Sequence, residues 1–171
     1  LIHLMIIKAI NFLVYLLRYL TIIHTKYNVS NKINFGSRLA NIFFKKNLKK
    51  CKFYLEYGSG NSTILAHELD KQFQSIETDK SFYKFMKTKK IENIVFSDLG
   101  PTKYFSFPIL PLMFIKKKIE FYGNYLDHFY KQKKTIPDLI LIDGRFRVFT
   151  CINILNFLSK NKIKKKIKII I

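Results

Sequence analysis

The pattern of apolar positions changes along this chain and predicts alternating strands and helices from residue 37 onward. Short apolar runs predict strands, whereas segments with apolar residues every three or four positions predict helices. We expect strands at 53–55, 73–76, 93–96, 139–142 and 166–171, and helices at 37–50, 62–69, 81–89, 120–133 and 149–158. Strands that alternate with helices predict a parallel sheet covered on both faces, and therefore an α/β fold.

The N-terminal block, residues 1–23, is hydrophobic and long enough to span a bilayer. However, Lys8, Asn11, Tyr15 and Arg18 recur at spacings of three and four, which places them on one stripe of a helix. A lysine near mid-span costs about 2.5–3.5 kcal/mol on membrane insertion. The pattern therefore favours an amphipathic helix, on a membrane surface or packed against protein, over a membrane anchor. It lacks the charged start and small-residue cleavage site of a signal peptide.

The rest of the chain divides into a polar linker over 24–36 and one domain over 37–171. A length of 171 residues fits a single domain of ordinary size. If residues 1–23 do anchor the protein, the basic residues that follow would keep the domain on the cytoplasmic side. We therefore expect a cytoplasmic protein, with association to a membrane surface through residues 1–23 left open.

The large basic surplus of the chain does not by itself predict a nucleic-acid partner. The 31 Lys and Arg residues outnumber the 11 Asp and Glu residues and give a net charge of +20, a surplus typical of proteins that bind polyanions. Arginine, which nucleic-acid readers favour, accounts for just four of the 31. Lys, Ile, Asn, Phe and Tyr are all abundant and share A/T-rich codons, so genome base composition explains the surplus. We expect no specific nucleic-acid partner, and the two cysteines and four histidines show no metal-ligand spacing.

A glycine turn joins the first predicted strand to the following helix. Gly58 and Gly60 permit a tight turn and the close approach of a ligand. Thr63 stands where a dinucleotide-binding fingerprint needs its third glycine, and no P-loop motif occurs in the chain. Glu56, two residues before the first glycine, would repel a phosphate at the helix N-terminus but suits a cationic amino group.

Glu77 ends the second predicted strand. A carboxylate at this position can accept hydrogen bonds from the hydroxyl groups of a ribose. A ligand with a ribose at one end and a cation at the other, and without a phosphate, matches S-adenosylmethionine.

Three strings along the chain resemble the class I S-adenosylmethionine-dependent methyltransferases, and in particular a bacterial group: E-Y-G-S-G-N-S-T at 56–63, S-I-E-T-D at 75–79 and D-L-I-L-I-D-G-R-F-R at 138–147. The resemblance covers about residues 37–171. It implies a Rossmann-like parallel sheet in the order 3-2-1-4-5, with helices on both faces and S-adenosyl-L-methionine as cofactor. The family's sheet has seven strands, whereas this chain ends at the fifth, so we expect the domain to be incomplete at its C-terminus.

The resemblance also implies roles for individual residues. Asp143 would face the transferring methyl group and the substrate, while Arg145 and Arg147 would bind the substrate or simply pair with acidic neighbours. Gly58 and Gly60 could instead make a tight turn without a ligand, and Asp98 could be a turn cap. The residues expected to bind the cofactor are Glu56, Gly58, Ser59, Gly60, Ser62, Thr63, Glu77 and Asp98.

The sequence thus predicts an enzyme that transfers a methyl group from S-adenosylmethionine to a small-molecule acceptor, such as a sugar or a surface-polymer precursor. Asp143 is the expected group to orient or deprotonate that acceptor. The alternative is a non-catalytic, membrane-associated Rossmann-like binding module. A nucleic-acid methyltransferase is less favoured, because the Asn/Asp-Pro-Pro-Tyr signature of enzymes that methylate base amino groups is absent.

Overall fold

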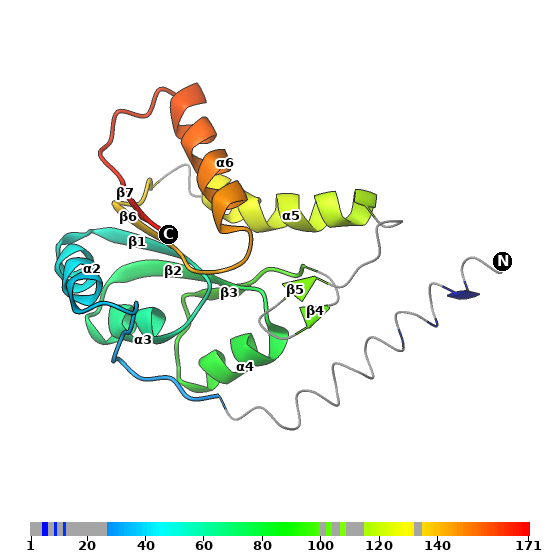
Figure 1. Cartoon of the computed structure of the whole chain (residues 1–171), viewed down its shortest axis with the longest axis horizontal. Helices are drawn as coiled ribbons and strands as arrows, with labels where there is room; N and C mark the ends of the chain where they lie inside the picture. The colour runs from blue at the N-terminus through cyan, green and yellow to red at the C-terminus, as the bar shows by residue number, and fades with distance from the viewer. Residues whose placement is uncertain are drawn as a thin grey trace.

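Five parallel strands form the central sheet of the molecule, in the order β3-β2-β1-β6-β7 (Figure 1). This order confirms the Rossmann-like α/β fold and the 3-2-1-4-5 arrangement expected from the sequence. The computed structural model describes residues 27–99, 115–131 and 135–171, four residues near the N-terminus, and the backbone at 102–103 and 107–108. The strands of the sheet are β1 (Phe53–Tyr57), β2 (Gln72–Glu77), β3 (Ile94–Phe96), β6 (Leu139–Ile142) and β7 (Lys168–Ile170).

Helices cover both faces of the sheet. Alternate residues of the strands point to opposite faces, as the pleat requires. Tyr54 and Leu139 pack with residues of α2, α3 and α4, whereas Leu55 and Ile140 pack with residues of α5 and α6, so one core lies on each side of the sheet. Figure 1 shows α2, α3 and α4 on one side of the sheet and α5 and α6 on the other. The helices are α2 (Arg38–Lys50), α3 (Asn61–Glu68), α4 (Lys80–Thr88), α5 (Ile115–Tyr130) and α6 (Arg147–Lys160).

Element boundaries differ from the sequence-based expectation in a few places. β1 continues through Glu56 to Tyr57, and all five of its residues are buried. α4 begins at Lys80 because the side chain of Asp79 caps it, accepting hydrogen bonds from the NH groups of Ser81 and Phe82 at 2.8 and 2.9 Å. α5 begins at residue 115 rather than 120. The proline-containing stretch before α5 includes a small antiparallel pair, β4 (Thr102–Lys103) and β5 (Phe107–Pro108).

Residues 27–36, which we call the N-terminal strap, contain no helix or strand but pack against the domain. Ile33 and Phe35 join the core beside α2. Asn61, the first residue of α3, holds the strap at two points: its Oδ1 accepts from the NH of Ser30 and its Nδ2 donates to the carbonyl of Lys32, both at 2.9 Å. The strap therefore lies beside the start of the helix that follows the glycine turn.

The structure describes four residues of the N-terminal block, Met5, Ile6, Ala9 and Phe12, which are helical and exposed. The predicted polar stripe of Lys8, Asn11, Tyr15 and Arg18 lies outside the described residues. Among the residues that are described, none of the helices is both long enough and apolar enough to cross a membrane.

Candidate functional site

The carboxyl ends of three neighbouring strands bring the predicted site residues to one edge of the sheet. Tyr57, the last residue of β1, is in register with Ile76 of β2 and Ile142 of β6. The glycine turn and Asp143 therefore follow adjacent strand ends directly, and Glu77 is the last residue of β2. In an open parallel sheet, ligands bind outside this edge.

Gly58 lies where the turn after β1 meets the turn after β6. Its φ is +98°, and a Cβ built on it would lie 2.7 Å from the backbone nitrogen of Gly144. Both facts exclude a side chain at this position. The need for glycine at 58 thus comes from contact between two turns of the protein itself.

Gly60, by contrast, borders open space. A Cβ built on Gly60 would meet no atom within 4 Å, so its backbone is accessible to a ligand. Its NH donates to Oγ1 of Thr63 at 2.8 Å, which fixes the turn at the start of α3. Gly60 is therefore the glycine of the motif that a bound molecule could approach.

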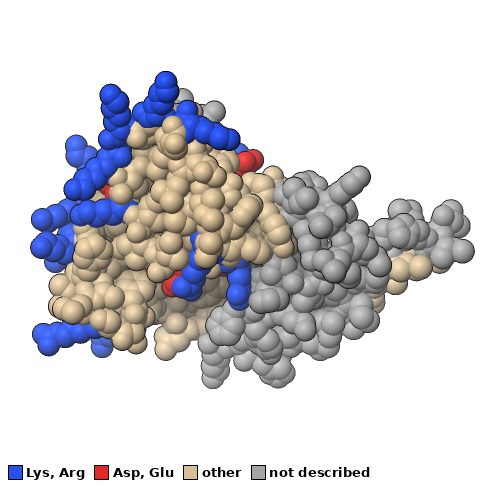
Figure 2. Space-filling model, turned by 45° about the horizontal axis from the view of Figure 1, so that its top comes forward, with Lys and Arg blue, Asp and Glu red and all other residues tan. Residues whose placement is uncertain are grey.

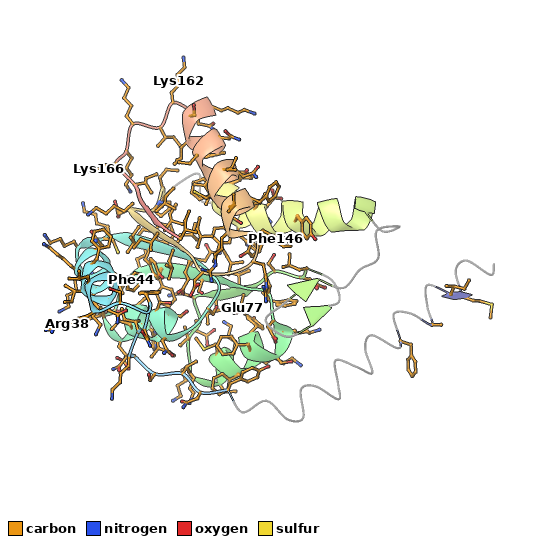
Figure 3. All side chains as sticks on the ribbon, in the orientation of Figure 1. Arg38, Phe44, Glu77, Phe146, Lys162 and Lys166 are labelled. Carbon is orange, nitrogen blue, oxygen red and sulfur yellow. The ribbon has the colours of Figure 1, made fainter. Side chains whose placement is uncertain are left out.

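Glu77 connects the end of β2 to the glycine turn. The carboxylate is 5% exposed and accepts three main-chain hydrogen bonds, from Thr78 at 2.6 Å, Asp79 at 2.7 Å and Ser59 at 3.1 Å. Burial raises the pKa of the Glu77 carboxyl to about 7, although the three NH donors act in the opposite direction. Figure 3 shows Glu77 in the interior of the molecule, between α5 and α4 in that view.

Glu56 is fully buried, and both oxygens of its carboxylate accept hydrogen bonds from hydroxyl groups. Tyr54 and Ser62 donate to Oε1, while Thr63 and Ser75 donate to Oε2. Burial raises the pKa of the Glu56 carboxyl to about 7, and the four hydroxyl groups partly counter this effect. The side chains of Glu56, Ser62 and Thr63, all expected near the cofactor, thus face one another inside the protein.

Asp143 and the two nearby arginines occupy the turn between β6 and α6. Asp143 is half-exposed and forms an ion pair with Arg147, four residues later. Burial and the neighbouring Arg147 guanidinium lower the pKa of Arg145. Phe146, between the two arginines, has a left-handed backbone with φ of +56°, uncommon for a bulky residue, and its ring lies 4.3 Å from that of Tyr122.

Asp98 follows the end of β3, where the NH of the preceding Ser97 donates to the carbonyl of Glu77 at 2.8 Å. Asp98 itself is exposed. It therefore lies at the same edge of the sheet as the glycine turn, one strand beyond Glu77. Within the described parts of the chain, His, Cys, Asp and Glu side chains form no group that could hold a metal ion.

Two side chains of this region were not singled out by sequence reasoning. Ser75, in the middle of β2, is fully buried and contacts both Glu56 and Ser59. Tyr125 on α5 is 1% exposed, and its hydroxyl oxygen lies 2.5 Å from a Cβ built on Gly144 and beside the backbone of Arg145. The sequence could have pointed to Ser75, because a serine within a buried strand needs a hydrogen-bond partner. Nothing in the sequence distinguished Tyr125 from the other aromatic residues of its helix.

Comparison with known proteins gives one informative match. No protein-family model matches the chain, and no curated protein matches it by sequence. Among solved structures it is similar to a methyltransferase-like protein from Silicibacter pomeroyi DSS-3, with 28% sequence identity and a TM-score of 0.59 over 71% of this chain and 66% of the other. This chain has a methyltransferase-like fold. It spans just under two thirds of that neighbour's length.

Proposed function

We propose that the protein is a class I methyltransferase that uses S-adenosyl-L-methionine to methylate a small-molecule acceptor, such as a sugar or surface-polymer precursor. The observation that carries the proposal is the hydrogen bond from the Ser59 NH to the buried Glu77 carboxylate. This bond joins the glycine turn to a carboxylate suited to ribose hydroxyls. The methyltransferase-like fold of the structural neighbour supports the same function.

The chemistry of the turn suits this cofactor. The side chains that hold the turn are a carboxylate and hydroxyls, from Glu77, Thr63 and Ser75. Thr63 occupies the position where a dinucleotide-binding fingerprint needs its third glycine, and its hydroxyl bonds Glu56 and the NH of Gly60, which disfavours a dinucleotide. The open space at Gly60 leaves room for a ligand against the main chain.

S-adenosylmethionine, when bound, supplies a methyl group on a positively charged sulfur, which a nucleophile displaces in line with the departing sulfur. The protein would contribute orientation and the exclusion of water, effects worth up to ~7–11 kcal/mol for well-placed reactants. Glu77 would hold the ribose hydroxyls, and Asp98 would lie near the adenine. Asp143 would orient the acceptor and take its proton, with its carboxylate held by Arg147, and Arg145 would contact the acceptor.

Isothermal titration calorimetry with S-adenosylmethionine tests the proposal. We expect the protein to bind one equivalent, and Glu77→Ala to raise the Kd by about 10- to 100-fold, because hydrogen bonds to a charged group contribute about 1.5–3 kcal/mol. The matched control is Glu92→Ala, which removes an exposed glutamate paired with Lys87 on the protein surface. Absence of binding by the unaltered protein would refute the proposal.

A second candidate is a non-catalytic, membrane-associated Rossmann-like module. It is favoured by exposed apolar side chains near the N-terminus, on Met5, Ile6 and Phe12, and along α6, on Val148 and Ile152. Exposed apolar groups of this kind are typical of surfaces that meet a membrane or a partner. A protein that floats with lipid vesicles but does not bind S-adenosylmethionine would favour this candidate over the enzyme.

A further inference from the structure

Two chains of hydroxyl groups connect the buried carboxylate of Glu56 to the glycine turn. In the first, Ser75 Oγ donates to Glu56 Oε2 at 3.0 Å and lies 2.8 Å from Ser59 Oγ. In the second, Thr63 Oγ1 donates to the same Oε2 at 2.5 Å and accepts from the NH of Gly60 at 2.8 Å. One carboxylate oxygen thus holds two consecutive residues of the turn, Ser59 and Gly60, without touching either.

The direction of the bonds in the first chain follows from proton counting. A serine hydroxyl has a single proton to donate. When the Glu56 carboxyl is ionised it can only accept, so the proton of Ser75 is directed to it; Ser75 then accepts from Ser59, and the Ser59 hydroxyl is oriented toward the interior. In that ionised state the hydrogen bonds allow one orientation of the Ser59 hydroxyl.

β2 holds Ser59 at two points. Ser75 binds its hydroxyl, and Glu77, two residues further along the same strand, binds its NH at 3.1 Å. Ser75 is also the residue in register with Glu56 on the neighbouring strand. The position of the turn relative to β2 is thus set from both the side chain and the main chain of one residue.

We propose that Ser75 is a positioning residue of the candidate cofactor site, acting through Ser59 to set the conformation of the glycine turn, with Glu56 as its anchor. Ser75 is fully buried, so it acts without contact to a ligand. A buried carboxylate that accepts from several hydroxyls rigidifies its surroundings when all its bonds are made. The inference rests on the proposed function for the identity of the ligand, while the ordering of the turn can be measured without one.

The test compares Ser75→Ala with Thr150→Val. Thr150 on α6 is also fully buried, but its hydroxyl has no hydrogen-bond partner among the described residues. Thr150→Val therefore removes a buried hydroxyl without breaking a hydrogen bond. The readouts are amide hydrogen exchange at Ser59 and Gly60 in the ligand-free protein and the Kd for S-adenosylmethionine. We expect Ser75→Ala to speed exchange at both amides and raise the Kd by about five- to tenfold, the effect of losing the hydrogen bond that holds the Ser59 hydroxyl. Thr150→Val should change neither.

A double-variant cycle shows whether Ser75 acts through Ser59. If it does, Ser59→Ala combined with Ser75→Ala should weaken binding no more than Ser75→Ala alone, because Ser75→Ala already removes the bond between the two hydroxyls. Equal exchange rates in Ser75→Ala and Thr150→Val, or additive effects in the cycle, would overturn the inference. Should Ser75→Ala fail to fold, Ser75→Cys, which is close in volume but a weak donor, replaces it with the same expected outcomes. If the unaltered protein does not bind S-adenosylmethionine, the proposed function fails, but the exchange comparison still decides the role of Ser75.

Discussion

At the scale of single residues, two buried glutamates make the stability of this protein depend on pH. Glu56 and Glu77 are at most 5% exposed, and burial raises the pKa of each carboxyl to about 7. Such carboxyls bind a proton more readily in the folded chain than in the unfolded chain. They therefore favour folding most at low pH, and this contribution is lost as the pH rises through the folded-state pKa.

Glu56→Gln should flatten the dependence of the unfolding free energy on pH. In the unaltered protein, the Glu56 contribution is fully present below about pH 4.5 and declines until just above pH 7, by a total on the order of 3 kcal/mol, since one pKa unit is about 1.4 kcal/mol. A glutamine cannot ionise, so the variant lacks this decline. Urea denaturation at several pH values between 5 and 8 measures the free energy of unfolding, with Glu92→Gln at an exposed site as control. Parallel profiles for Glu56→Gln and the unaltered protein would contradict the argument.

The two glycines of the turn should respond differently to substitution. Gly58→Ala places a methyl group 2.7 Å from the Gly144 nitrogen and forces a side chain into φ +98°, so we expect a loss of about 2–5 kcal/mol in the free energy of unfolding. Gly60→Ala meets no neighbouring atom and should change stability by less than about 1 kcal/mol. Its methyl group would instead occupy the space proposed for the cofactor and weaken binding. Thermal unfolding and calorimetry on both variants separate these effects, and a large loss of stability in Gly60→Ala would contradict them.

At the scale of elements, the two ends of the parallel strands differ. The candidate site lies at the carboxyl ends of the strands, whereas Asp138 connects segments at their amino ends. Its carboxylate accepts from the NH groups of Lys52 and Phe53, both at 2.9 Å, and pairs with Lys165 at 2.9 Å. These contacts tie the start of β1 and the segment before β7 to the start of β6.

Asp138→Ala should destabilise the fold by about 1–3 kcal/mol at pH 7, because it leaves main-chain donors of β1 without their acceptor. Partial burial raises the pKa of Asp138, but Lys165 and the two NH groups outweigh it, so the pKa lies below its ordinary value. The stabilisation is therefore present above that ordinary pKa and is lost as the pH falls below it. Chemical denaturation at pH 7 and pH 3 measures the change, and the gap between variant and unaltered protein should be smaller at pH 3. A gap of equal size at both values would show that the ionised carboxylate is not responsible.

At the scale of the whole molecule, the net charge of +20 is visible as projecting lysine and arginine side chains. Figure 2 shows Lys and Arg side chains mainly along the top and left margin of that face, with a few near its lower centre, around a broad uncharged area. Nucleic-acid-binding domains usually concentrate their basic residues on one face or along one helix. That the protein has no specific nucleic-acid partner therefore stays a prediction, and it rests on the scarcity of arginine.

The strands were predictable because local signals determine them, whereas their order was expected from the resemblance to the class I methyltransferases. The buried strand β6 is a continuous apolar run, and the glycine turn after β1 follows a short apolar segment, so the alternation with helices was readable from the sequence. The boundaries were less predictable. β1 continues through Glu56 because hydroxyls from Ser62, Thr63 and Ser75, which lie elsewhere in the chain, satisfy a carboxylate that the sequence pattern treats as the end of a strand.

The sequence by itself determined the residue types that gather at the carboxyl edge, because parallel strands place their ends together and Gly58, Glu77 and Asp143 each follow a recognisable strand. Only the tertiary structure decided what each residue does there. Gly58 is required by Gly144, from a distant part of the chain, and Glu56 faces Ser75 across two paired strands. Contacts of this kind depend on strand register and side-chain direction, which one sequence does not specify. They determine which residues support the turn and which can contact a ligand.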